Sequence, residues 1–191
     1  MMQPYRLMLP LLLLAVTSSS LATQTIVFFR HGEKPGDSSG QLNCQGLNRA
    51  LALPQVLLSR FGTPGALFAA APDTRLGGSV RPLSTIIPLA VRLTMPVNIQ
   101  YHSGDIKQAA NALLNDKQAL TMVAWEHNNL VKIAKTVIYN AGGDPSLVPD
   151  TWSDKDFDSL YVVTINNAVT PHQVTFSHQY QGLNNMSGLC R

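Results

Sequence analysis

Near the start of the chain, an apolar run turns abruptly polar: Ile26-Val27-Phe28-Phe29-Arg30-His31-Gly32-Glu33-Lys34-Pro35. The first four residues favour a buried parallel strand, and such strands deliver functional side chains at their carboxyl ends. Arg30 offers a planar fork of donors suited to phosphate or carboxylate, and His31 can act as nucleophile, base or ligand. The stretch therefore predicts a strand that leads directly into a functional site.

The composition predicts one folded domain. The chain has 191 residues, of which 45% are hydrophobic and 13% are charged, which is enough for a single substantial core. Its formal net charge is only +3 and it contains no basic run, so nucleic-acid binding is not predicted. No internal repeat or linker marks a second domain.

Residues 1–22 have the pattern of an export signal. Arg6 is the only charge before the apolar run of residues 7–16, and Ser20-Leu21-Ala22 is an acceptable small-x-small cleavage site. The apolar run is shorter than the roughly 20 residues that a membrane span needs. We therefore expect an exported protein, periplasmic or secreted, with a mature domain over residues 23–191 and no stable membrane insertion. A retained anchor or a buried helix is the alternative.

The chain has two cysteines, Cys44 and Cys190. In an oxidising compartment a disulfide would connect the C-terminal tail to the first loop. Two unpaired thiols in the core are the alternative, and the sequence leaves both open. Neither Cys-x-x-Cys nor His-x-x-x-His spacing occurs, so no metal site is predicted.

Apolar periodicity predicts the other elements. A helix over 44–61 is expected, with Asn43 as its cap and Pro54 as a kink or a split. Arg49 is expected to be a solvated residue of this helix, with contact to a substrate as the alternative. The remaining expected strands cover 67–71, 97–101, 120–125, 160–165 and 174–177, and the remaining helices begin near Ser79, at Asp105 and at Leu130. This order predicts a three-layer α/β/α fold, with a mostly parallel central sheet and a C-terminal antiparallel edge hairpin.

Polar residues follow three of the predicted strands. Arg30 and His31 follow the first strand, a loop leading to Arg81 follows the second, and Glu126 with His127 follows strand 120–125. Because the carboxyl ends of strands form the ligand crevice of open α/β sheets, these groups are expected to converge. Two arginines and two histidines together would suit a tetrahedral dianion.

This set of motifs resembles the histidine phosphatase (phosphoglycerate mutase-like) superfamily. The matching elements are Arg30-His31-Gly32, Arg81-x-x-x-Thr85 at a helix start, and His127 at a strand end. Pro82 and Asn128 depart from the family pattern, which prefers alanine and glycine at these positions. Arg75, in the preceding loop, is the rival of Arg81 for the second arginine.

The resemblance implies a phosphatase that needs neither metal nor cofactor. His31 would be the nucleophile and form a phosphohistidine, while Arg30, Arg81 and His127 would hold the phosphoryl oxygens. The leaving alkoxide needs a proton. Glu126 is the first choice as its donor, followed by Glu33, which is also expected to contact substrate, and by Asp105.

The expected partner is a phosphorylated small molecule or a phosphorylated macromolecule. Two other functions compete with the phosphatase. One is a non-catalytic exported protein that binds phosphate or a phospho-ligand on the same fold. The other is a metal-dependent hydrolase that uses the five histidines. The sequence leaves the substrate and the oligomeric state open.

Overall fold

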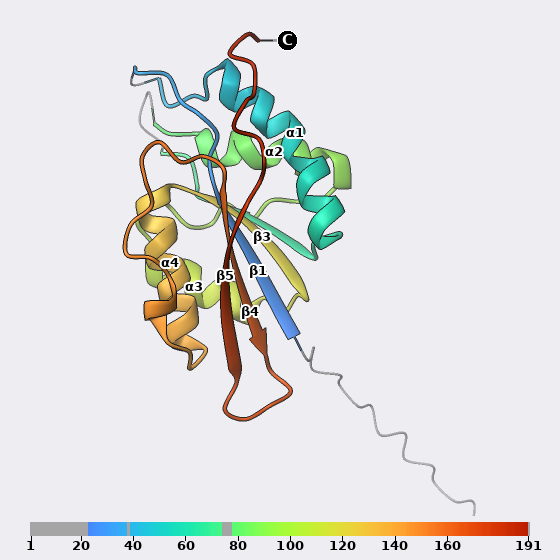
Figure 1. The fold of residues 1–191 in the computed structure, drawn as a ribbon, viewed down its shortest axis with the longest axis vertical. Helices are drawn as coiled ribbons and strands as arrows, with labels where there is room; N and C mark the ends of the chain where they lie inside the picture. Colours follow the sequence, from blue (N-terminus) through green and yellow to red (C-terminus); the bar gives the residue numbers. More distant parts are fainter. Residues whose placement is uncertain (1–22, 38, 74–77, 191) are drawn as a thin grey trace, which may run out of the picture.

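The structure, a computed structural model, describes residues 23–37, 39–73 and 78–190 (Figure 1). The predicted export signal over residues 1–22 lies outside the described residues, so it stays a prediction. Within the described part of the chain, no helix is both long enough and apolar enough to cross a membrane.

A five-stranded sheet in the order β2-β3-β1-β4-β5 forms the centre of the fold. Its strands are β1 (Thr23–Arg30), β2 (Ala66–Ala69), β3 (Leu120–Trp125), β4 (Ser159–Asn166) and β5 (Gln173–Tyr180). The pairs β1–β3 and β2–β3 are parallel, whereas β1–β4 and β4–β5 are antiparallel. Since β5 reverses the direction of β4, only β4 opposes the others. The predicted mostly parallel sheet with an edge hairpin is confirmed.

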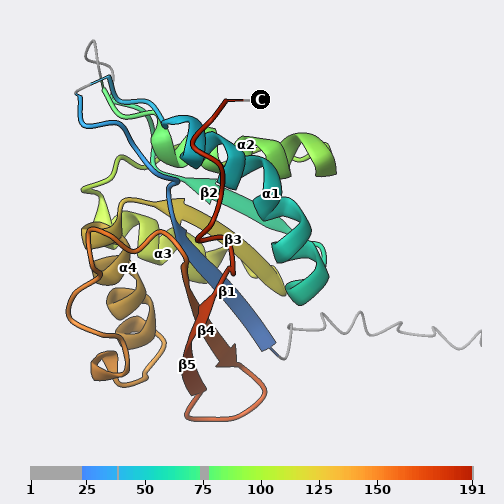
Figure 2. The ribbon, with the colours of Figure 1, turned by 45° about the horizontal axis from the view of Figure 1, so that its top comes forward.

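Helices cover both faces of the sheet (Figures 1 and 2). They are α1 (Cys44–Phe61) and α2 (Arg81–Leu93) on one face, and α3 (Ile106–Asn115) and α4 (His127–Asn140) on the other. Alternate residues of β1 supply both cores, because neighbouring side chains in a strand point to opposite faces. Val27 and Phe29 pack with α1 and α2, whereas Ile26 and Phe28 pack with α3 and α4. The predicted three layers are confirmed.

Helix α1 has the predicted boundaries. The Asn43 side chain caps it by accepting a hydrogen bond from the Gly46 amide at 2.9 Å. Pro54 lies within the helix without splitting it, so the predicted split is wrong. A proline removes only one main-chain hydrogen bond, and burial of Leu53 and Leu57 on either side holds the helix together.

The predicted strand over residues 97–101 is wrong. The segment makes only two isolated bridges, from Asn98 to Phe68 and from His102 to Ala71. Between them, the Asn98 side chain accepts a hydrogen bond from the Gln100 amide at 3.0 Å. Such a local side-chain bond competes with strand pairing and interrupts the ladder.

Three helix starts differ in detail from prediction. Helix α4 begins at His127 rather than Leu130, because both Glu126 carboxylate oxygens accept hydrogen bonds from amides of its first turn. Val80 rather than Ser79 occupies the cap position of α2, without a side-chain cap. Asp105 stands at the cap position of α3, but its carboxylate accepts from the His102 amide at 2.8 Å.

The C-terminal tail lies against α1 (Figure 2). A disulfide joins Cys44, the first residue of α1, to Cys190. Asn48 adds hydrogen bonds to the carbonyls of Ser187 and Leu189, both at 2.8 Å. Of the two alternatives that the sequence left open, the structure therefore contains the disulfide.

The two faces of α1 provide a matched test of the core. Leu57 is fully buried against the sheet, whereas Leu51 is 57% exposed. Leu57→Ala should lower the free energy of unfolding by about 2–5 kcal/mol, because it leaves a cavity. Leu51→Ala should change it by no more than about 0.5 kcal/mol. Urea denaturation measures both, and equal losses would contradict the packing described.

Candidate active site

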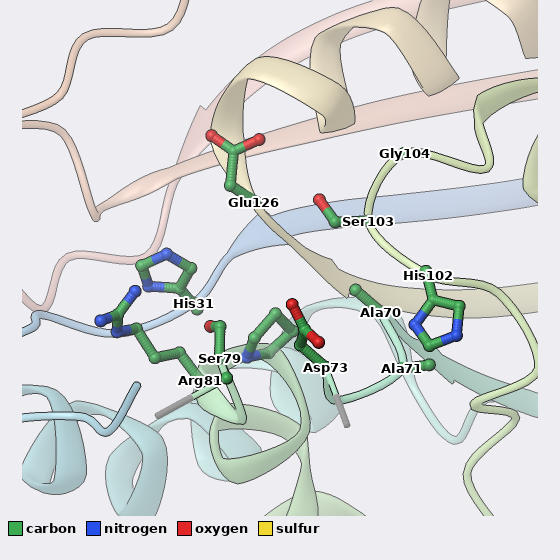
Figure 3. Close-up of a pocket in the computed structure, with 12 residues that line it drawn as sticks. His31, Ala70, Ala71, Asp73, Ser79, Arg81, His102, Ser103, Gly104 and Glu126 are labelled. Atoms are coloured by element: carbon green, nitrogen blue, oxygen red, sulfur yellow. The ribbon is translucent and has the colours of Figure 1, made fainter. Parts of the chain in front are cut away.

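A pocket of about 600 Å³ lies at the carboxyl ends of β1, β2 and β3 (Figure 3). Each wall comes from a segment that follows one of these strands or opens a helix. The lining residues are His31, Ala70, Ala71, Asp73, Gly78, Ser79, Arg81, Pro82, His102, Ser103, Gly104 and Glu126. This is the position at which open α/β sheets bind ligands.

His31 is held in one orientation at the end of β1. Its amide donates to the Trp125 carbonyl at 3.0 Å, which extends the pairing of β1 with β3 to the pocket. Its Nδ1 lies 2.8 Å from the Gly32 carbonyl oxygen. Because a carbonyl can only accept, Nδ1 carries the hydrogen and Nε2 keeps its lone pair.

The surroundings of His31 favour the neutral imidazole. Burial lowers the pKa of His31 to about 4, and the positive charges of Arg30 and Arg81 act in the same direction. The hydrogen bond to Gly32 and the charge of Glu126 raise this pKa without cancelling the effect of burial. At neutral pH the Nε2 lone pair is therefore available for attack.

The loop after β1 packs tightly on α1. A Cβ atom at Gly32 would lie 2.7 Å from the Gly46 carbonyl oxygen, so only glycine fits there. The Gly32 amide donates to Thr85 Oγ1 at 2.9 Å, and this hydroxyl donates to the Arg81 carbonyl at 2.8 Å. The Arg81-x-x-x-Thr85 motif thus ties the start of α2 to the residue after His31.

Arg81 and Glu126 share the pocket with His31. The Arg81 side chain extends toward the His31 ring (Figure 3), and its Nε donates to the Gln41 carbonyl at 3.0 Å. Glu126 lines the wall at the end of β3, where its carboxylate also caps α4. Three of the predicted site residues therefore come together. Arg75, the predicted rival of Arg81, lies outside the described residues.

Arg30 does not line this pocket. It is buried, and its Nη1 donates to the carbonyls of Ser153, Asp154 and Asp156 at 3.3, 2.8 and 3.1 Å. Its guanidinium carbon lies 3.9 Å from the centre of the Phe157 ring. Burial lowers the pKa of Arg30, and the nearby carboxylates, Asp154 first among them, oppose this shift.

His127 likewise does not line the pocket. Its Nε2 lies 2.5 Å from Asp154 Oδ1. Its Nδ1 lies 2.7 Å from Glu126 Oε1, but without the alignment of a hydrogen bond. His127 therefore reaches the pocket only through Glu126.

Glu33 belongs to a buried ionic cluster rather than to the pocket. Arg49 binds its carboxylate through Nε, at 2.9 Å from Oε2, and through Nη2, at 2.7 Å from Oε1. Nη1 of Arg49 also contacts Asp158 at 3.2 Å and Gln181 at 3.0 Å. Arg49 is 1% exposed, so the expectation of a solvated residue is wrong: two carboxylates compensate its charge inside the protein. Asp105, the third proton-donor candidate, also does not line the pocket.

Sequence reasoning missed part of the lining, namely Asp73, His102 and Ser103. Asp73 follows β2 closely, so the rule that functional groups follow strand ends would have found it. Ser103 carries no such signal. It is held by distant partners, with its carbonyl accepting from Trp125 Nε1 at 3.0 Å and its hydroxyl from Asn129 at 3.1 Å.

In the three described segments, no cluster of three or more His, Cys, Asp or Glu side chains is arranged to hold a metal ion.

The fold has a counterpart among solved structures. It is similar to a crystal structure from Escherichia coli K-12 MG1655, of a protein provisionally identified as an alpha-ribazole-5'-P phosphatase. The similarity covers 82% of this chain and 96% of that chain, with a TM-score of 0.50 and 13% sequence identity. The fold is consistent with the phosphoglycerate mutase-like fold. At this identity the likeness shows the fold alone. No family model matches the chain, and no curated protein matches it.

Burial of His31 should make stability depend on pH. The pKa of His31 is about 4 in the folded protein, against 6.5 for an unperturbed histidine, so only the unfolded chain binds this proton between those values. Unfolding free energy should therefore fall by on the order of 3 kcal/mol from this group as the pH falls from 6.5 to 4. Urea titrations across this range should show a shallower fall in His31→Asn, while exposed His172→Asn follows the wild type. If the unfolding free energy of His31→Asn fell with pH as steeply as that of the wild type, the low pKa of His31 would be contradicted.

The Arg49 cluster predicts a large loss of stability when a residue outside the pocket is substituted. Arg49→Met should lower the unfolding free energy by about 3–5 kcal/mol, because it leaves buried carboxylates without a counter-charge. Arg92→Met is the matched control, since Arg92 makes only an exposed hydrogen bond to Gln55, and should cost no more than about 0.5 kcal/mol. If Arg49→Met and Arg92→Met had the same denaturation midpoint, the buried ion pairs of Arg49 would be refuted.

Proposed function

We propose that the protein is a phosphatase that hydrolyses phosphomonoesters through a phosphohistidine intermediate on His31. The observation that supports this most directly is the hydrogen bond between His31 Nδ1 and the Gly32 carbonyl, at 2.8 Å. It assigns the hydrogen to Nδ1 and leaves Nε2 as a neutral nucleophile in a pocket that also contains Arg81.

In the first step, the Nε2 lone pair attacks phosphorus while the bond from phosphorus to the ester oxygen breaks. Arg81 offsets the charge on the phosphoryl oxygens with charge-assisted hydrogen bonds. Glu126, which lines the same pocket, enters this step as the protonated acid and gives its proton to the departing alkoxide. Since the imidazole itself is the nucleophile, this step needs no metal-activated water.

In the second step, water attacks the phosphoryl group and the bond between nitrogen and phosphorus breaks. The Glu126 carboxylate, which lost its proton in the first step, takes one from the water. Inorganic phosphate leaves, and His31 returns to the neutral tautomer with its hydrogen on Nδ1. Protons balance over the cycle, so no further acid or base is required.

The proposal agrees with two other observations. The structure from E. coli with a similar fold is described as a phosphatase that acts on a 5'-phosphate, which is a reaction of the same class. The pattern of residues 1–22 and the Cys44–Cys190 disulfide are compatible with a protein that acts outside the cytoplasm, and we include export in the proposal.

Hydrolysis of p-nitrophenyl phosphate in the presence of a chelator tests the proposal. His31→Ala should abolish turnover, and Arg81→Ala should reduce kcat by about 100- to 1000-fold, because one charge-stabilising group is lost. Exposed His172→Ala should keep wild-type activity.

The other outcomes are distinct. If the protein binds phosphate but hydrolyses none of a panel of phosphoesters, it is a phosphate-binding protein and the phosphatase proposal is wrong. Collapse of activity on chelation would favour a metal-dependent hydrolase.

A further inference from the structure

One loop segment, residues 153–157, holds both Arg30 and His127. Three of its main-chain carbonyls accept from Arg30 Nη1, and the Asp154 carboxylate contacts His127 Nε2. The Phe157 ring lies against the Arg30 guanidinium, and its centre is 6.2 Å from that of the His31 ring. The segment therefore occupies the guanidinium of Arg30 and the imidazole of His127.

The fit between this segment and its two partners is incomplete. Over residues 23–37, 39–73 and 78–190, the buried side-chain polar atoms without a hydrogen-bond partner are Arg30 Nε and His127 Nδ1. Unsatisfied polar groups are rare inside proteins and point to a missing partner. His127 Nδ1 lies 2.7 Å from Glu126 Oε1 without the alignment of a hydrogen bond, so Arg30 Nε is the atom that segment 153–157 leaves without a partner.

The chemistry of the contacts also favours replacement of the segment by an anion. Nη1 of Arg30 carries two hydrogens but has three carbonyl oxygens as acceptors. Neutral carbonyls offset a buried guanidinium less well than a phosphate dianion, which can bind two guanidinium nitrogens at once. A phosphate would satisfy the geometry of Arg30 with charged acceptors.

The exposed part of the segment, residues 153–155, can move without disrupting the core. The Asp154 side chain is 86% exposed, so its carboxylate can exchange His127 for water. On either side the chain is fixed, because Trp152 is buried in the core and the Asp156 carboxylate accepts hydrogen bonds from the amides of Asp158 and Ser159, at 2.9 and 3.0 Å. The movable part is therefore confined to residues 153–155.

We propose that residues 153–155 form an autoinhibitory strap that competes with phosphate for Arg30 and His127. In the strapped state, Arg81 is the one arginine among the described residues that line the pocket. When the strap is displaced, Arg30 and His127 join Arg81 around the phosphoryl group. This regulation rests on the proposed phosphatase site, and a purely structural role of the strap is the competing explanation.

Asp154→Asn tests the strap, since it weakens the contact to His127 at an exposed position. Asp150→Asn is a matched control: Asp150 is also an exposed carboxylate preceding β4, and it pairs with Lys135 at 2.5 Å. Titration calorimetry with inorganic phosphate should give an apparent Kd at least about fivefold lower for Asp154→Asn than for the wild type. The reason is that the strap is displaced, and phosphate can bind, in a larger fraction of the molecules. Asp150→Asn should match the wild type.

Hydrogen exchange provides a second readout that does not depend on turnover. Phosphate added to the wild-type protein should increase deuterium uptake at residues 153–155, because binding displaces the strap. Phosphate binding that leaves this uptake unchanged or lowers it would overturn the strap, as would equal or weaker binding by Asp154→Asn.

The two proposals can fail separately. Tighter phosphate binding by Asp154→Asn, with no phosphoester hydrolysis by any variant, would support the strap and refute the phosphatase. Hydrolysis by the wild type, with no gain in phosphate affinity in Asp154→Asn, would refute the strap alone. Absence of phosphate binding in all three proteins would refute both.

Discussion

The buried guanidinium of Arg49 fixes the surroundings of His31. A charge with 1% exposure is tolerated only if it is paired, and Arg49 pairs with Glu33 from the loop after β1 and with Asp158 from the loop before β4. The loop after β1 also touches α1, because Gly32 lies in close contact with Gly46. These constraints hold the Gly32 carbonyl in place, and this carbonyl sets the tautomer of His31. The His31 ring is thus held in one orientation and one tautomer by the protein itself.

The charge of the pocket differs from what the motifs suggest. Counting Arg30, Arg81 and two histidines predicts a strongly cationic cavity, but the described lining contains Arg81 together with the carboxylates of Asp73 and Glu126. The guanidinium of Arg30 is nearby, but residues 153–157 bind it. Attraction for an anion therefore depends on the state of this segment, and not only on which residues surround His31.

Local patterns predicted the elements and only part of the site. Helix α1 and β3 had clear periodicity, and the strand-end rule correctly grouped His31, Arg81 and Glu126. Arg30 lies on the same face of β1 as Ile26 and Phe28, and the carbonyls of residues 153–157 bind its guanidinium outside the pocket lining. Its capture by residues 153–157, and the burial of Arg49 by Asp158, join segments far apart in sequence that no periodicity connects.

The position of β1 has a consequence for biosynthesis. It is the first strand of the sheet to leave the ribosome, yet it lies between β3 and β4, which are made much later. Until then its apolar residues have no partner strand, and pairing over such distances along the chain is slow. The nascent chain therefore carries an aggregation-prone segment for most of its synthesis, and holding chaperones would find their binding site in the same residues that later present His31.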